Sequence, residues 1–274
     1  MPELPEVETV RRSLEKRLVG RTIRQVNIYM PKIIKIPEPK LFARFLEGQT
    51  IVDLQRRGKY LLFCLASGYV WVTHLRMTGQ FIYSKQEEPL LKHTHLTFTL
   101  DNGHQLRYVD IRQFGTMYLL RPDEFKKVRG LRELGPEPLG EEFTLEELYK
   151  KLAGKKGKVK QLLLNQAFVA GIGNIYADEI LFDAGLHPER GADTLSPEEI
   201  EQLYYSIRKM LELGIANRGT TVRNYVDGDG RSGNFQELLK VYGRAGEPCY
   251  RCGRPLIKQQ VAGRSSCYCP NCQK

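Results

Sequence analysis

The sequence lacks any apolar run that approaches the roughly 20 residues of a membrane-spanning helix. Its first six residues, Met1 to Glu6, are acidic and lack the apolar core of a secretory signal peptide. No internal repeat and no low-complexity stretch is present. We therefore expect a globular cytosolic protein, and 274 residues with a hydrophobic share of 41% are enough for two domains with real cores.

Acidic residues are scarce relative to basic ones: 32 Asp and Glu stand against 42 Lys and Arg, a formal net charge of +10. This charge suits a polyanionic partner, most simply nucleic acid, although a soluble basic protein without such a partner has the same balance. Ten basic and four acidic residues fall between Arg218 and Lys274. Other basic sites lie at 56–59 and 155–160. Basic sites on separated segments fit a groove formed by folding better than one disordered arm.

The N-terminal half reads as one helix followed by strands. Apolar residues between Leu4 and Leu18 recur at spacings of three and four, which predicts a helix that Gly20 ends. Short β-like runs follow at 22–29, 50–55, 59–65, 69–75, 95–100, 105–111 and 116–120. Asp101-Asn102-Gly103 is a typical hairpin turn. The pattern indicates a sandwich or barrel-like half.

The composition changes at 134–138, where two prolines and a glycine indicate a linker. Helical patterns follow at 144–152, 159–165, 175–184 and 196–213, and two of these starts, at Thr144 and Ser196, have the spacing of a capping box. Residues 215–246 are rich in Gly, Arg, Asn and Asp and are expected to form loops.

The six cysteines include two C-x2-C pairs, Cys249 with Cys252 and Cys269 with Cys272. Four thiolates in two such pairs complete the tetrahedral shell of Zn²⁺ and leave no open position, so we expect one structural zinc ion. Two disulfides are the alternative, and a cytosolic chain makes them improbable. Cys64 is expected in the core, and Cys267 breaks the ligand spacing.

Pro2 follows the initiator methionine, and removal of Met1 would expose a secondary amine. An α-amino group titrates at about 7.7–8.0, so a useful fraction is an unprotonated nucleophile near pH 7. Glu3 and Glu6 lie beside it as candidate proton carriers. Taken alone, these residues fit a plain helix start equally well, because Pro5 suits a first turn and Glu complements the helix dipole.

Six segments together are more specific. They occur in the order seen in bacterial formamidopyrimidine-DNA glycosylase (8-oxoguanine DNA glycosylase), and the chain resembles this family over essentially its whole length. The segments are Pro2-Glu3-Leu4-Pro5-Glu6-Val7-Glu8-Thr9, Arg57-Gly58-Lys59-Tyr60, His74-Leu75-Arg76-Met77-Thr78-Gly79, Asp110-Ile111-Arg112-Gln113-Phe114-Gly115, Gly171-Ile172-Gly173-Asn174-Ile175-Tyr176 and the four-cysteine finger.

The resemblance implies an α+β fold. An N-terminal β-sandwich flanked by helices is expected over 1–134, then a linker over 135–140 and a helix–two-turn–helix module over 141–216. A lesion-capping loop over 217–237 and a zinc-finger β-hairpin over 238–274 complete the expected organisation. DNA is bound in the family's cleft.

The resemblance also implies catalytic roles. It makes Pro2 the Schiff-base nucleophile, Glu3 the proton donor for base removal and Glu6 a supporting carboxylate. Lys59 is the implied proton donor of β-elimination and a phosphate contact, and Arg264 the implied donor for δ-elimination. Such enzymes excise an oxidised purine and nick the strand on both sides of the abasic sugar.

A base inside a duplex cannot be attacked at C1′, so it must be flipped out and the hole filled. Met77, Arg112 and Phe114 resemble the family's void-filling set, with Arg112 facing the orphaned cytosine. Without the resemblance, core packing is the simpler interpretation of Met77 and Phe114. Thr78 stands where some relatives carry Glu, so the inspection of the lesion there is expected to differ.

Further contacts with DNA are implied. Gly173 and Asn174 resemble the phosphate-binding turn of the helix–two-turn–helix. The same resemblance assigns DNA contacts to a scattered set of side chains, namely His74, His93, Lys155, Lys156 and Tyr242. His93 would serve equally as a structural partner of His95. Residues 220–235 correspond to the lesion-capping loop, expected to be mobile until a base is flipped.

Two other functions stay open. An endonuclease VIII-like glycosylase would act on oxidised pyrimidines, and Leu4 with the intact void-filling set argues against it. A non-catalytic zinc-finger DNA-binding protein fits the charge and cysteines equally well and is favoured if Met1 is retained. An RNA-binding protein would need a stacking motif that the sequence does not contain. The family acts as a monomer.

Overall fold

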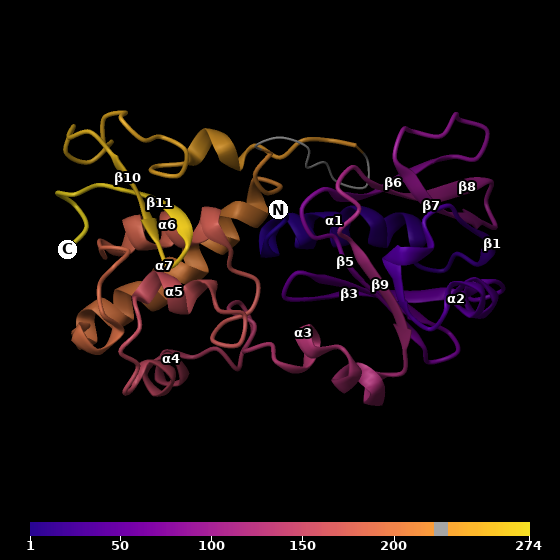
Figure 1. Cartoon of the computed structure of the whole chain (residues 1–274), viewed down its shortest axis with the longest axis horizontal. Helices are drawn as coiled ribbons and strands as arrows, with labels where there is room; N and C mark the ends of the chain where they lie inside the picture. The colour runs from indigo at the N-terminus through magenta and orange to yellow at the C-terminus, as the bar shows by residue number, and fades with distance from the viewer. Residues whose placement is uncertain (222–229) are drawn as a thin grey trace. The chain divides into compact units, whose positions relative to one another are not determined.

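The computed structural model describes residues 1–221 and 230–274, and the chain divides into two compact units (Figure 1). One unit comprises residues 1–132 together with 217–234. The other comprises residues 133–216 together with 235–274. Each unit has its own group of buried apolar side chains.

The first unit contains two β-sheets. The four-stranded sheet is antiparallel throughout, in the order β1 (Ile23–Ile28), β7 (Thr94–Leu100), β8 (His104–Asp110) and β6 (Gly79–Lys85). The five-stranded sheet has the order β2 (Ile34–Ile36), β9 (Thr116–Leu120), β5 (Val70–His74), β4 (Tyr60–Leu65) and β3 (Ile51–Arg57). Only its β2–β9 pair is parallel.

The two sheets share one core around Trp71 of β5. Its ring centroid lies 4.1 Å from that of Phe63 in the same sheet and 4.2 Å from that of Phe98 in the other. The N-terminal helix α1 (Leu4–Leu18) adds its apolar face to this core, as the spacing of its buried residues predicts. The expected β-sandwich with flanking helices is confirmed.

Helix α2 and strand β6 are among the elements of this unit that the sequence pattern does not predict. Helix α2 (Pro39–Leu46) buries only Phe42 and Leu46, one turn apart, and its eight residues are too few for a clear period. In strand β6 only Gly79 and Phe81 are fully buried, so the alternation that marks a half-buried strand stops after three residues.

The second unit is built from helices and one hairpin. Helix α6 (Asn174–Ala184) packs against α5 (Val159–Leu164), α7 (Pro197–Ala216) and strand β11 (Arg264–Tyr268), while α4 (Leu145–Leu152) packs against α7. Strand β10 (Ile257–Val261) pairs with β11. The hydroxyl of Thr144 accepts a hydrogen bond from the backbone nitrogen of Glu147, and Ser196 and Glu199 form the predicted capping box.

Short elements complete the two units: α3 (Arg129–Arg132), η1 (Pro31–Ile33), η2 (Pro122–Lys127), η3 (Ala192–Thr194) and η4 (Phe235–Leu238). Among the described residues, no helix combines the length and the apolar character needed to cross a membrane.

Candidate functional site

The start of the chain is buried around two carboxylates. Pro2 is buried, and Glu3 and Glu6 are 3% and 2% exposed. One oxygen of Glu6 accepts a hydrogen bond from the backbone nitrogen of Glu3 at 2.8 Å, and the other accepts one from the backbone nitrogen of Thr220 at 2.7 Å. Glu6 therefore fixes the residues next to Pro2 against the segment that begins the expected lesion-capping loop.

Lys59 lies in the turn between β3 and β4 and is 6% exposed. The guanidinium of Arg56 donates to the carbonyl oxygen of Gly58 at 3.2 Å and to the carboxylate of Glu8 at 3.1 Å. Burial raises the pKa of Glu8, but its hydrogen bonds with Arg11 and Arg12 and the nearby charge of Arg56 outweigh this and lower it. The residues around Glu8 in the sequence do not indicate its hydrogen bond with Arg56, which lies 48 residues away.

Met77, Arg112 and Phe114 lie on two exposed loops of the first unit. Met77 is 42% exposed and Phe114 is 52% exposed, so the alternative in which they pack into the core does not hold. A guanidinium nitrogen of Arg112 lies 2.9 Å from the sulfur of Met77, and the guanidinium carbon lies 4.8 Å from the ring centroid of Phe114. The three side chains thus form one exposed group.

The two histidines named as DNA contacts differ in environment. His74 is buried and its Nδ1 accepts a hydrogen bond from the backbone nitrogen of Arg76 at 2.9 Å. Burial, with the charges of Arg76 and Lys59, lowers the pKa of His74 to about 3, so the ring is neutral near pH 7. His93 is half-buried, and its ring centroid lies 6.5 Å from that of His95.

The turn before α6 is held by Gln166, which no local sequence pattern marks. The side-chain amide of Gln166 accepts from the backbone nitrogen of Gly171 at 2.9 Å and donates to the carbonyl oxygen of Ile172 at 2.8 Å. Gly171 has a φ of 86°, a conformation that favours glycine. Gly173 then caps the helix that begins at Asn174.

In the second unit, a hydrogen bond joins Asn174 to the residue that follows Arg264. The side-chain amide nitrogen of Asn174 donates to the carbonyl oxygen of Ser265 at 2.8 Å, while its buried Oδ1 has no hydrogen-bond partner among the described residues. Arg264 precedes Ser265 at the tip of the β10–β11 hairpin and is exposed. The hairpin turn has positive φ at Ala262 and Gly263, which matches the twist of the strands.

Lys160 corrects one sequence-based interpretation. The basic run at 155–160 predicts an exposed lysine there, yet Lys160 is fully buried and its ammonium lies 2.6 Å from Asp178 and 2.5 Å from the hydroxyl of Ser266. Burial raises the pKa of Asp178 to about 6 against the opposing effect of Lys160. Lys155 and Lys156 are exposed in the loop after α4.

A second buried carboxylate, Glu179 on α6, positions Tyr242. Glu179 is 1% exposed and accepts hydrogen bonds of 2.9 Å from the backbone nitrogens of Lys240, Val241 and Tyr242. The half-buried Tyr242 therefore sits on a backbone turn that α6 holds in place. Nothing in the local sequence marks Glu179, because its partners are more than 60 residues away.

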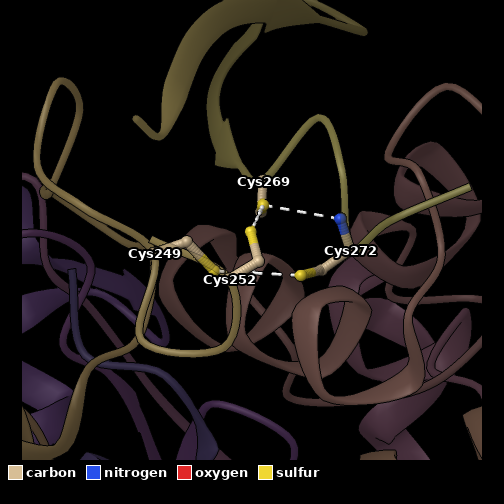
Figure 2. Close-up of side chains that lie close together, drawn as sticks. All are labelled: Cys249, Cys252, Cys269 and Cys272. Atoms are coloured by element: carbon tan, nitrogen blue, oxygen red, sulfur yellow. Dashed lines mark hydrogen bonds between the residues drawn. The ribbon is translucent and has the colours of Figure 1, made fainter. Parts of the chain in front are cut away.

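The four cysteines of the two C-x2-C pairs converge, and Figure 2 shows their side chains turned toward one another. The sulfur atoms lie within 4.8 Å of one another, with Cys249 and Cys272 at 3.9 Å and Cys252 and Cys269 at 3.5 Å. Zn–S bonds of about 2.3 Å in a tetrahedron place sulfurs roughly 3.8 Å apart, so the set fits zinc.

The two remaining cysteines lie outside this group. Cys267 is buried, and its backbone nitrogen donates to Asp178 at 3.0 Å. Cys64 is half-buried on β4. The expected lesion-capping loop lies partly outside the described residues, which omit 222–229.

Three family models match the chain. They are the formamidopyrimidine-DNA glycosylase N-terminal domain over residues 1–117, the formamidopyrimidine-DNA glycosylase H2TH domain over residues 134–226, and the zinc finger found in FPG and IleRS over residues 246–274. The third match and the sulfur geometry agree on one structural zinc ion held by the four cysteines, as the sequence predicts.

Relatives and solved structures agree with these matches. The chain is 52% identical over 274 residues to the formamidopyrimidine-DNA glycosylase of Pelotomaculum thermopropionicum, covering 100% of this chain and 99% of that protein. It is 51% identical over 277 residues to that of Heliobacterium modesticaldum, covering 100% of both. The wild-type Lactococcus lactis Fpg in complex with a DNA containing N7-benzyl-Fapy-dG is 40% identical, with a TM-score of 0.93 over 100% of both chains.

The Lactococcus lactis Fpg in complex with a DNA containing an abasic site is 39% identical, with a TM-score of 0.92 over 99% of both chains. The resemblance drawn from the six sequence segments is confirmed over the whole chain. The chain belongs to the formamidopyrimidine-DNA glycosylase family.

Proposed function

We propose that this protein is a base-excision repair enzyme, a DNA glycosylase and abasic-site lyase that removes oxidised purines, 8-oxoguanine and formamidopyrimidines, from duplex DNA. The observation that carries the proposal is the buried N-terminus, where Glu6 holds the backbone of Glu3 beside Pro2. Solved relatives of 39–40% identity bind DNA containing a Fapy-dG derivative or an abasic site, which supports the same substrates here.

The first step uses the amine of Pro2 once Met1 has been removed. Its nitrogen attacks C1′ of the damaged nucleotide, the bond from C1′ to the base breaks, and Glu3 supplies a proton to the departing base. The Pro2 nitrogen then loses its proton and its lone pair expels O4′ from C1′, with O4′ taking up a proton, so that the ring-opened sugar is left as an iminium on Pro2. A secondary amine can form this cation, and the low pKa of an α-amino group supplies the free base near pH 7.

The second step cleaves the strand. Loss of a proton from C2′ of the iminium expels the 3′ phosphate, and a second elimination expels the 5′ phosphate. We assign proton transfer in the first elimination to Lys59 and in the second to Arg264, as the resemblance implies. The burial of Lys59 in a turn held by Arg56 supports a fixed position for its ammonium.

DNA binding and base flipping complete the proposal. Met77 and Phe114 would enter the stack as apolar wedges, and Arg112 would bond the unpaired cytosine. The remaining assigned groups would contact the DNA backbone: His74, His93, Lys155, Lys156, Gly173, Asn174 and Tyr242. In this proposal the enzyme is a cytoplasmic monomer that is associated with the nucleoid while it is bound to DNA.

Borohydride trapping tests the proposal. The protein is incubated with a duplex carrying 8-oxoguanine opposite cytosine, and the adduct is located by peptide mass. We expect a covalent link at Pro2, lost in Pro2→Gly and in protein that retains Met1. Glu3→Gln should lose the adduct on the 8-oxoguanine duplex and keep it on an abasic-site duplex, because only base removal needs the proton donor.

The other outcomes separate the alternatives. An adduct formed only on a duplex with an oxidised pyrimidine would favour the endonuclease VIII-like activity. Tight binding without any adduct, despite a free N-terminal proline, would favour the non-catalytic DNA-binding protein.

A further inference from the structure

A single buried carboxylate joins the two loops that carry the exposed group of Met77, Arg112 and Phe114. Asp110, the last residue of β8, is 0% exposed. Its Oδ1 accepts from the hydroxyl of Thr78 at 2.5 Å and from the backbone nitrogen of Arg112 at 3.2 Å. Its Oδ2 accepts from the backbone nitrogen of Gly115 at 2.8 Å and from the hydroxyl of Tyr108 at 3.3 Å. These four bonds use the acceptor capacity of a carboxylate.

Thr78 closes the link from the other loop. Its hydroxyl donates to Asp110 and accepts a hydrogen bond from the backbone nitrogen of Arg112 at 3.0 Å. Residue 79 begins β6 and pairs in register with Asp110. The hydroxyl of Thr78, between Met77 and β6, is thus hydrogen-bonded both to the Asp110 carboxylate and to the backbone of the loop that carries Arg112.

Both loops contain a residue in the left-handed region that is not glycine. Arg76, beside Met77, has a φ of 55°, and Gln113, between Arg112 and Phe114, has a φ of 58°. Such conformations are disfavoured and persist only when the surroundings enforce them. The backbone nitrogen of Gln113 donates to the carbonyl oxygen of Asp110 at 3.2 Å. Asp110 therefore also helps to hold the left-handed conformation of Gln113.

The space at the base of the loops is also filled. A Cβ atom at Gly115 would lie 1.6 Å from the hydroxyl oxygen of Tyr108, and one at Gly79 would lie 2.4 Å from it. Both glycines are therefore required for the loops to close on Tyr108 and Asp110. The backbone that carries the three exposed side chains is thus held by hydrogen bonds and by close packing against Tyr108.

We propose that Asp110 and Thr78 are positioning residues that hold Met77, Arg112 and Phe114 in one preformed arrangement for opening the DNA base stack. The inference rests on the proposed function, because it assigns the exposed group to duplex opening. A wedge already fixed in its working arrangement loses little conformational freedom on entering DNA. Thr78 acts through Arg112 and Met77 and contacts no reacting atom.

The test compares Thr78→Val, which keeps the shape and removes the hydroxyl, with Thr78→Ser, which keeps the hydroxyl. Asp110→Asn is a poor first choice, because a buried carboxylate with four partners is needed for folding. Base-stack opening is followed by stopped-flow fluorescence of 2-aminopurine beside 8-oxoguanine in a duplex. Schiff-base formation is followed on a single-stranded abasic oligonucleotide, which has no base-paired duplex to open.

We expect Thr78→Val to slow stack opening about tenfold, the effect of one hydrogen bond to a charged group, and Thr78→Ser to retain the original rate. Trapping on the single strand should be the same for all three proteins. Hydrogen exchange of the free protein should be faster at residues 111–115 in Thr78→Val, because the nitrogen of Arg112 loses an acceptor.

Equal stack-opening rates in Thr78→Val and the original protein would overturn the positioning role. So would a loss of trapping on the single strand as large as the loss on the duplex. An original protein that gives no adduct on any substrate, while Thr78→Val still slows stack opening, would overturn the proposed function and leave the positioning role standing.

Discussion

One carboxylate oxygen of Glu6 accepts a hydrogen bond from the backbone nitrogen of Thr220 at 2.7 Å, across 214 residues of sequence. The other oxygen accepts from the backbone nitrogen of Glu3 at 2.8 Å. Gly219, next to Thr220, has a φ of 75°, and a Cβ atom there would lie 2.7 Å from the same Glu6 oxygen. The start of α1 and the start of the expected lesion-capping loop are thus set by one side chain.

Gly219→Ala should therefore damage the site. The methyl group adds backbone strain and displaces the Glu6 carboxylate, at a combined cost of about 1–3 kcal/mol, so we expect single-turnover excision of 8-oxoguanine to slow by roughly fivefold or more. Gly20→Ala is the matched control, since Gly20 has a φ of 83° and nothing within 4 Å of an added Cβ atom. Equal excision rates in the two variants would contradict the role assigned to Glu6.

The neutral state of His74 predicts a pH dependence of stability. Its pKa is lowered to about 3 in the folded protein, against about 6.5 in an unfolded chain, so the unfolded state binds the extra proton between these values. This contribution is fully present above pH 6.5 and is lost as the pH falls toward 3, at up to about 1.4 kcal/mol per pH unit.

Urea unfolding at pH 7.5 and pH 5 measures this effect. His74→Gln, whose side-chain oxygen can still accept from the nitrogen of Arg76, should lose about 2 kcal/mol less than the original protein over that interval. His104→Gln is the control, because His104 is half-buried. An unchanged pH dependence in His74→Gln would show that another group dominates.

Much of this site follows from local sequence, and the reason is physical. The bounds of α1 match the prediction because its apolar residues recur with the helical period. The four cysteines were identifiable because zinc requires thiolates at short, fixed spacing. Only the family resemblance indicates the exposure of Met77 and Phe114, since apolar residues in a β-rich half are more often in the core.

The positioning residues could not be predicted from local patterns. Lys160 reads as one more exposed lysine, because its partners Asp178 and Ser266 are 18 and 106 residues away. Asp110 is the last residue of β8 and looks like an ordinary polar residue at the end of a strand. Buried charges are recognised by what surrounds them in space, and a one-dimensional pattern holds that information only for neighbours.

Serine substitutions should distinguish the four ligand cysteines from Cys267 by their effect on zinc content. Cys269→Ser removes a ligand, so we expect zinc content to fall below one ion per chain and binding to lesion-containing DNA to weaken at least tenfold, because the hairpin carrying Arg264 loses its support. Cys267→Ser should keep one ion per chain, because its thiol lies outside the group. Metal analysis by mass spectrometry measures both, and zinc loss in Cys267→Ser would contradict the ligand assignment.

Substitution of Arg56, with Arg12 as the control, tests whether Arg56 holds the turn that carries Lys59. Both guanidinium groups donate to Glu8, at 3.1 and 2.8 Å, but only Arg56 also donates to the carbonyl oxygen of Gly58. Arg56→Met should slow strand cleavage of an abasic-site duplex about tenfold, the effect of losing a charge-assisted hydrogen bond that fixes Lys59. Arg12→Met should stay within about twofold, because its exposed side chain contributes little.

The rate of borohydride trapping distinguishes this effect from a general one. Under the proposed mechanism, Schiff-base formation depends on Pro2 and not on Lys59, so trapping on the same duplex should be unchanged in Arg56→Met. The side chain of Arg56 is only 12% exposed, which makes loss of a direct phosphate contact a poor explanation for slower cleavage. If both variants slow cleavage equally, the cause is the charge around Glu8, and the turn that holds Lys59 is not set by Arg56.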